Sequence, residues 1–300
     1  MLLNAYGRGG MLAVRAGSDD TCQGCTGKDC IMACSRNKFD ARSCPSLLNP
    51  PKLNSNKDCL VCGQCIKSCE PDNMQLLLRK PFSEKDTREQ KASWSLTIFI
   101  MLVSGFVTYE LSTEWAAANK MFLIIPDFLT DQLGLENAAG FIKGIWTIGI
   151  FPLLLWTLLG VLTVLTKGAK SIFDAWRELA LPSVIIISAG HVIKAVAKLN
   201  TWAGYIPGSI KDTNGEETAK LISAGVNIPE AFISNLAVSI IGIFILVLAF
   251  IYSIREEKII FNSYINSHFL PKLILFLLFS TIVMESVRLV LHWNLTEDLL

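Results

Sequence analysis

Cys59-Leu60-Val61-Cys62-Gly63-Gln64-Cys65-Ile66-Lys67-Ser68-Cys69 is the stretch that decides how the first part of this chain folds. The first three cysteines are each separated by two residues and the fourth follows after three, which is the spacing by which a loop and a helical turn wrap a [4Fe–4S] cube. In such a run the fourth thiolate turns away to ligate a neighbouring cluster. The sequence therefore predicts two clusters. Candidate ligands for the second lie just upstream: Cys22, Cys25, Cys30, Cys34 and Cys44.

All nine cysteines lie at or before residue 69, and the 231 residues that follow contain none. An odd number of closely spaced cysteines is poorly explained by a disulfide framework, so metal binding is the better interpretation. Zinc is the alternative metal, because two Cys-x2-Cys pairs can form a tetrahedral site. The Cys59 run fits a cube better than a single ion. The four-residue gap before Cys30 is less diagnostic, so the upstream block alone does not separate the two metals.

Two short β-like runs, at 12–16 and 74–80, flank the cysteines, and the prolines and Asn/Ser residues of 43–56 indicate an irregular loop between the two blocks. A module of this size has little apolar core and depends on metal for its stability. We therefore expect residues 1–81 to form a ferredoxin-like α+β domain that binds two [4Fe–4S] clusters. A charged linker over 82–93 would lead from it to the rest of the chain.

The second part, 94–300, is rich in apolar residues and raises the whole chain to 51% hydrophobic residues and a mean hydropathy of +0.44. A helix needs about 20 such residues to cross a bilayer core. The weakest candidate carries His191, Lys194 and Lys198, and its alternative interpretation is a buried or re-entrant helix. The connections 112–141 and 200–231 contain amphipathic stretches suited to the membrane interface. We predict an α-helical membrane bundle of about five transmembrane helices: 94–111, 142–165, 181–199, 232–254 and 273–293.

The distribution of lysine and arginine predicts the orientation of the chain. Basic residues are concentrated before the first predicted span, between the second and third, and between the fourth and fifth. By the positive-inside rule the cysteine domain then lies in the cytoplasm and the C-terminus outside, which also suits reduced thiolates. We expect a multi-pass protein of the cytoplasmic (inner) membrane. The net charge of +1 gives no indication of nucleic-acid binding.

The run 58–69, followed by Leu76-Leu77-Leu78-Arg79-Lys80-Pro81, resembles the polyferredoxin-type membrane 4Fe–4S proteins, relatives of the quinol-linked iron–sulfur subunits of nitrate and nitrous-oxide reduction systems. The resemblance covers about residues 2–81. Over the helices it rests on Gly190-His191 and 202–205. Relatives tend to carry further membrane helices and another cysteine motif upstream. We therefore expect a split or shortened relative, with a separate subunit supplying those helices.

The resemblance also implies a ligand assignment. Bare spacing nominates Cys34 as the crossing ligand, but we favour Cys44, because Pro45 follows it as a proline follows the last ligand of bacterial cluster motifs. Cys34 is then a spare thiol. One departure from the family is Glu70, which stands between Cys69 and Pro71. The implied ligands are Cys22, Cys25, Cys30 and Cys69 for one cluster, and Cys44, Cys59, Cys62 and Cys65 for the other.

Charged residues inside the predicted spans fall at similar depth, and such residues usually face the bundle interior. His191 lies one helical turn from Lys194, on the same face of its helix. One interpretation is a structural ion-pair network, and the other is a quinone-head or proton-handling site in which His191 and Glu285 exchange protons. His191 and His292 differ in depth by about 11 residues, or roughly 16 Å, which argues against a shared haem. The charged group comprises Glu110, Lys194, Lys198, Glu285 and Arg288.

These features predict an electron-transfer protein that passes electrons between a cytoplasmic redox partner and the membrane or its quinone pool. No dinucleotide fingerprint, P-loop or nucleophile elbow is present, so we expect a subunit rather than a stand-alone enzyme. Two alternatives remain open. One is a redox-sensing or assembly protein, and the other is a non-catalytic membrane anchor of a larger respiratory complex.

Overall fold

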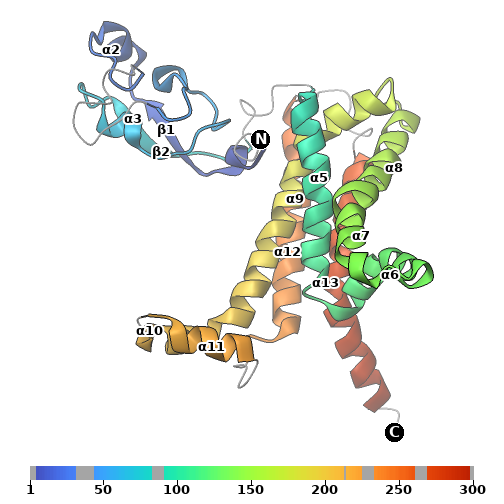
Figure 1. Cartoon of the computed structure of the whole chain (residues 1–300). Helices are drawn as coiled ribbons and strands as arrows, with labels where there is room; N and C mark the ends of the chain where they lie inside the picture. Colours follow the sequence, from blue (N-terminus) through green and yellow to red (C-terminus); the bar gives the residue numbers. More distant parts are fainter. Residues whose placement is uncertain are drawn as a thin grey trace.

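The computed structural model describes residues 5–31, 44–82, 91–212, 214–224, 233–260 and 269–297. In helices α12 (Asn235–Ile260) and α13 (Phe269–Glu297) the side chains are described as far as residues 254 and 284. Within these ranges a small cysteine-bearing module stands beside a bundle of long helices (Figure 1). Some residues named above lie outside the described part: Cys34 entirely, and the side chains of Glu285, Arg288 and His292.

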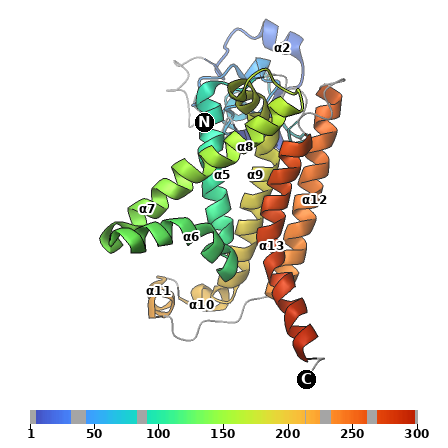
Figure 2. The same cartoon turned by 90° about the vertical axis from the view of Figure 1, so that its right-hand side faces the viewer.

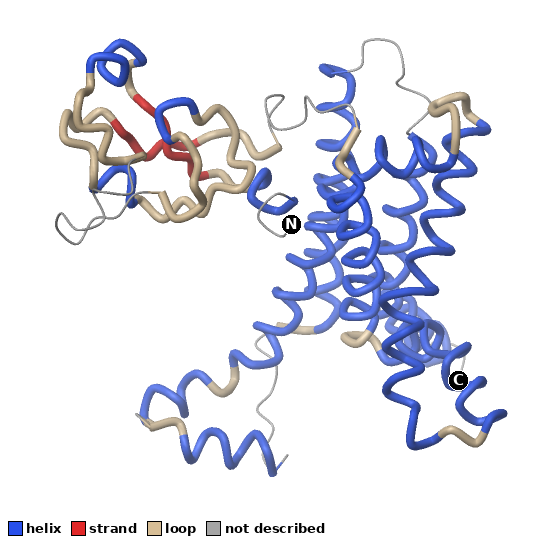
Figure 3. The backbone as a smooth tube through the Cα atoms, turned by 45° about the horizontal axis from the view of Figure 1, so that its top comes forward, coloured by secondary structure: helices blue, strands red, loops and turns tan. Residues whose placement is uncertain are grey.

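The module is built on a two-stranded antiparallel sheet (Figure 3). Strand β1 (Leu12–Ala16) pairs with β2 (Met74–Leu78), and Leu12 lies opposite Leu78. Both strands confirm the β-like runs of the sequence. The remaining elements are one-turn or two-turn pieces: η1 (Gly7–Gly9), α2 (Asp19–Gly24), η3 (Pro50–Lys52) and α3 (Gln64–Lys67).

The core of this module is very small. Its buried members are Val14, Met74, Cys30 and Cys65. The buried amide of Asn56 adds a polar tie by donating a 2.7 Å hydrogen bond to the carbonyl of Leu12. A core of this size supplies little hydrophobic stabilisation, and domains so small usually need a metal or a larger partner. The ferredoxin-like assignment stays a prediction.

The bundle contains four helical stretches that are long and apolar enough to cross a bilayer within the described residues, and they correspond to the first four predicted spans. The chain is therefore a membrane-embedded protein. The fifth predicted span, 273–293, lies within α13, whose described apolar part, Phe269–Met284, is shorter than the other four. The count of five stays a prediction. The four stretches are Trp94–Ser112 (α5), Glu136–Leu165, Ile172–Ala203 (α9) and Asn235–Ile254.

Helix α9 occupies the centre of the bundle, although the sequence marks it as the weakest span. It packs against α5, α8, α12 and α13 (Figures 1 and 2). Leu179, Ile186 and Ile193 are fully buried along it. Ser171 caps its N-terminus by accepting a 3.2 Å hydrogen bond from the amide of Asp174. Its most apolar stretch is more hydropathic than that of α5, so the charged residues of α9, and not its mean hydropathy, make it look weak in the sequence.

The stretch Glu136–Leu165 is a compound helix. It runs through η4 (Glu136–Ala138), α7 (Ala139–Ile145), the π-helical turn η5 (Trp146–Ile150) and α8 (Phe151–Leu165). Pro152 lacks an amide hydrogen, and a π turn just before it is one way to accommodate that loss. The π turn approaches α5 closely, because a Cβ on Gly105 would lie 2.2 Å from the carbonyl oxygen of Thr147. Only glycine fits there.

The end of the bundle away from the cysteine module carries lateral helices (Figure 1). Helix α6 (Ala116–Leu133) projects sideways together with α7 (Figure 2), and the two are joined by a 2.9 Å ion pair between Lys143 and Asp127. Met121, Ile124 and Phe128 are exposed on α6. Helices α10 (Ile206–Lys211) and α11 (Glu216–Ala224) lie at the same end (Figure 1). These elements fall in the connections whose amphipathic stretches suggest the membrane interface.

Hydrogen bonds of two tyrosines tie the described part of the module to the bundle. The Tyr6 hydroxyl and Nδ1 of His191, on α9, lie 2.9 Å apart. The Tyr252 hydroxyl, on α12, donates to the carbonyl of Pro81. Phe82, just beyond Pro81, is buried in the apolar core of the bundle. The module is thus held against the membrane helices at both ends of its chain segment.

Candidate functional site

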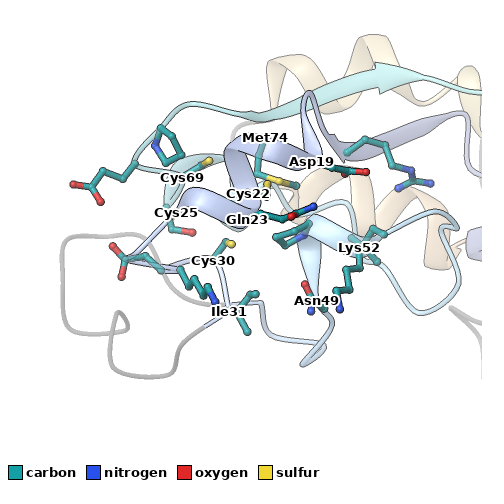
Figure 4. Close-up of a pocket in the computed structure, with 18 of the residues that line it drawn as sticks. Asp19, Cys22, Gln23, Cys25, Cys30, Ile31, Asn49, Lys52, Cys69 and Met74 are labelled. Carbon is teal, nitrogen blue, oxygen red and sulfur yellow. The ribbon is translucent and has the colours of Figure 1, made fainter.

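Four cysteines from separate parts of the module surround one hollow of about 720 Å³ (Figure 4). Cys22 lies on α2 and Cys25 directly ends that helix, so both reach the hollow from one short turn. Ser18 starts α2 by accepting a hydrogen bond from the amide of Thr21. The remaining two cysteines come from loops. The four are Cys22, Cys25, Cys30 and Cys69, the same set that the resemblance implies for one cluster.

Asn73 organises the sulfur atoms of this first hollow. Its backbone amide donates to Sγ of Cys69 at 3.2 Å, and its side-chain amide donates to Sγ of Cys22 at 3.1 Å. The same side chain bonds both backbone groups of Ser18, at 2.9 and 2.7 Å. Donors of this kind orient thiolate ligands and tune a bound metal centre. Sequence reasoning missed Asn73, whose only signal is its place four residues after the last cysteine.

A second hollow is lined by the other described cysteines, Cys44, Cys59, Cys62 and Cys65. The loop between Cys59 and Cys65 is tightly curled, because Val61 and Gly63 have positive φ angles of 51° and 74°. The amide of Val61 donates to Sγ of Cys59 at 3.5 Å. A valine in the left-handed region is costly, and such residues gather at functional sites. The curl turns three cysteines of the run toward one space.

The two hollows are neighbours. Cys30 from the first and Cys65 from the second are buried in the same small core, beside Val14 and Met74. The amide of Cys44 donates a 3.3 Å hydrogen bond to the carbonyl of Cys30. The two hollows therefore border the same small core.

Burial governs the proton affinity of the two innermost thiols. It raises the pKa of Cys30 to about 11, helped by the nearby Cys69 and Cys22 thiols. Burial likewise raises the pKa of Cys65 to about 11, with Cys59 as the main neighbour. Both thiols therefore keep their protons at neutral pH unless a positive charge displaces them. Metal ions do this, because the thiolate is the ligand.

The first of the two donor sets has room for a group larger than one ion. None of the eight described cysteines forms a disulfide. Among the described residues, no three His, Cys, Asp or Glu side chains converge closely enough for a single ion. Tetrahedral zinc with bonds of about 2.3 Å would require sulfur atoms about 3.8 Å apart. The first hollow has room for the eight atoms of a cube. The second, at about 20 Å³, holds little more than one water, so its loop would have to move outward.

The described members of the predicted intramembrane group are Glu110, Lys194 and Lys198, and the side chains of Glu285 and Arg288 lie outside the described residues. Nζ of Lys194 lies 2.9 Å from a carboxylate oxygen of Glu110 and 2.9 Å from one of Glu114. Lys198 is more distant, at 3.7 Å from Glu114. His191 instead meets Tyr6 and the ring of Phe106. The sequence missed Glu114, because it lies beyond the predicted end of the first span.

Comparison with protein-family models, with curated proteins and with solved structures finds no match to this chain.

Proposed function

We propose that this protein is a membrane-bound electron carrier whose N-terminal module binds two [4Fe–4S] clusters. The observation that supports this most directly is the sorting of eight cysteines into two adjacent hollows of four each. Four thiolates are the complete ligand set of one such cluster. A cysteine run with cube-type spacing contributes three residues to one hollow and its fourth, Cys69, to the other, as expected for a two-cluster module.

When bound, such clusters exchange single electrons, and the protein sets their potential through ligands, burial and hydrogen bonds. In this chain the amides of Asn73 and Val61 would supply the hydrogen bonds, and the core around Cys30 and Cys65 would exclude water. Cys62 is exposed and marks the side of the second site that is open to solvent. A soluble redox partner would approach from such a side.

The membrane or its quinone pool is the proposed second partner, with the module on the cytoplasmic side by the positive-inside rule. The bonds from Tyr6 and Pro81 to bundle helices support this, because they hold the cysteines close to the bilayer. Of the described residues, His191 is the better candidate for binding a quinone head. Lys194 is already satisfied by two carboxylates, which favours a structural role for that residue.

Metal analysis and electron paramagnetic resonance (EPR) test the proposal. The full chain, purified anaerobically in detergent, should contain about eight iron and eight sulfide per chain and show two interacting signals on reduction. Cys25→Ser and Cys62→Ser, one from each hollow, should each lose about half of the iron. Stoichiometric zinc without sulfide would contradict the proposal.

A second measurement separates carrier from sensor. The reduced clusters of a carrier should be reoxidised rapidly by added quinone or by a soluble acceptor. Clusters that cycle with a soluble acceptor and ignore every quinone would remove the quinone partner but retain the carrier. Clusters that degrade on a single oxidation would favour the redox-sensing alternative.

A further inference from the structure

One face of the two-stranded sheet is only partly covered. Directly opposed residues share a face, as do residues two apart, so Leu12, Val14, Leu76 and Leu78 point to the same side. The inner half of this face packs on the cysteine core, where Val14 is 1% exposed. At the outer end Leu12 and Leu78 are 48% and 80% exposed, and Leu76, which pairs with Val14, is 54% exposed. Contiguous exposed leucines on a small module mark a contact surface.

Met11 extends this surface at the start of β1 and is also exposed. We call Met11, Leu12, Leu76 and Leu78 the leucine face. Exposed Lys80 follows it in the chain after Arg79. Apolar side chains bordered by basic residues are the composition of a surface that rests on a bilayer with anionic headgroups.

The leucine face lies at the end of the sheet that is anchored to the membrane helices. Pro81 accepts its hydrogen bond from Tyr252, which lies inside the spanning stretch Asn235–Ile254. Leu78 is three residues from Pro81, a reach of at most about 10 Å along the chain. At the other strand, Tyr6 meets His191 inside the spanning stretch Ile172–Ala203. Helix α2 lies at the opposite end of the module (Figure 1).

We propose that the leucine face is seated in the lipid of the same bilayer that the bundle crosses. Its leucines would enter the boundary between headgroups and acyl chains, and Lys80 would reach the phosphates. The bilayer is the favoured occupant because the face is continuous with helices that are long and apolar enough to cross it. This goes beyond the electron-carrier function, which does not require the module to touch lipid.

Photo-crosslinking in the full chain tests this proposal. The chain is placed in nanodiscs of phosphatidylethanolamine and phosphatidylglycerol, with p-benzoyl-phenylalanine in place of Leu78, in place of Leu12, or in place of exposed Thr21 on α2 as the control. After illumination, intact mass spectrometry should show phospholipid adducts several-fold more abundant at positions 78 and 12 than at position 21.

Equal adducts at all three positions would overturn the proposal, as would adducts formed with a second protein chain. Hydrogen exchange of the β1 amides shows whether the sheet is intact in each variant. If the variant at one of the two positions on the face does not fold, the variant at the other still tests the proposal. The readout is lipid contact and not electron transfer. The lipid-contact proposal can therefore be wrong while the electron-carrier proposal is right, and the reverse.

Discussion

The amide of Cys44 donates a 3.3 Å hydrogen bond to the carbonyl oxygen of Cys30, which joins the walls of the two cysteine hollows. Cys44 lines the second hollow and Cys30 the first. A loop that closes one site is thereby fixed by the backbone of the other. The two sites should form and fail together to some degree, which makes the identity of the crossing ligand testable.

Cys44→Ser should remove the iron of the second site and weaken the first, because it deletes a ligand on a loop that both sites share. Cys34→Ser should keep the full iron content. The measurement is iron and sulfide per chain, with EPR of the reduced protein. If Cys34→Ser lost iron and Cys44→Ser kept it, the ligand assignment would be reversed, as bare spacing suggests.

Lys194→Met should destabilise the bundle by about 2–4 kcal/mol, because it leaves Glu110 and Glu114 without their shared cation. Lys194 is 13% exposed and Glu114 12% exposed, so solvent screens that ion pair weakly, whereas Glu110 is 32% exposed and contributes less. The matched control is Lys198→Met, since that lysine is 52% exposed and 3.7 Å from Glu114, and it should change stability by less than about 1 kcal/mol. Thermal unfolding in detergent measures both. Equal losses in the two variants would contradict this account.

Gly105→Ala should destabilise the packing of α5 against η5 by about 1–3 kcal/mol, because the added Cβ would lie 2.2 Å from the Thr147 carbonyl oxygen and a backbone group cannot move aside cheaply. Gly149→Ala, in the same π turn, is the control. Nothing lies within 4 Å of its added Cβ, so it should be neutral or gain about 0.5–1 kcal/mol. A Gly149 variant as unstable as the Gly105 variant would show that the π turn itself, and not the close approach, is sensitive.

Local patterns in the sequence predict the strands, four of the spanning helices and the candidate cysteines, because each depends on residues close together in the chain. The partners of α9 could not be predicted in this way. His191 and Lys194 lower its hydropathy, yet their partners Tyr6 and Glu114 come from remote segments. Helix α9 therefore looks weak in isolation and is central in the fold.

Asn73 was missed for a similar reason. Its amide reaches Cys22 across 51 residues of sequence, and an asparagine after a cysteine motif looks like an ordinary turn residue. Glu114 lies beyond the predicted end of the first span and also beyond the end of α5, yet Lys194 reaches past the helix end to contact it. Long-range hydrogen bonds and ion pairs leave no periodic trace in a sequence.

Gly63→Ala should weaken the second site through the backbone alone. Gly63 has a φ of 74° and free space around its missing Cβ, so alanine would add left-handed strain of about 1–2 kcal/mol and no clash. Such a cost corresponds to about a 5–30-fold change in an equilibrium. Iron release to a chelator should accelerate for about half of the iron, while Gly63→Asn, which tolerates positive φ, should release it more slowly than the alanine variant. Gly24→Ala, which also has free space but no positive φ, is the matched control and should behave like the unmodified protein. Release from all three variants at one rate would mean that the curl at Gly63 does not hold the site.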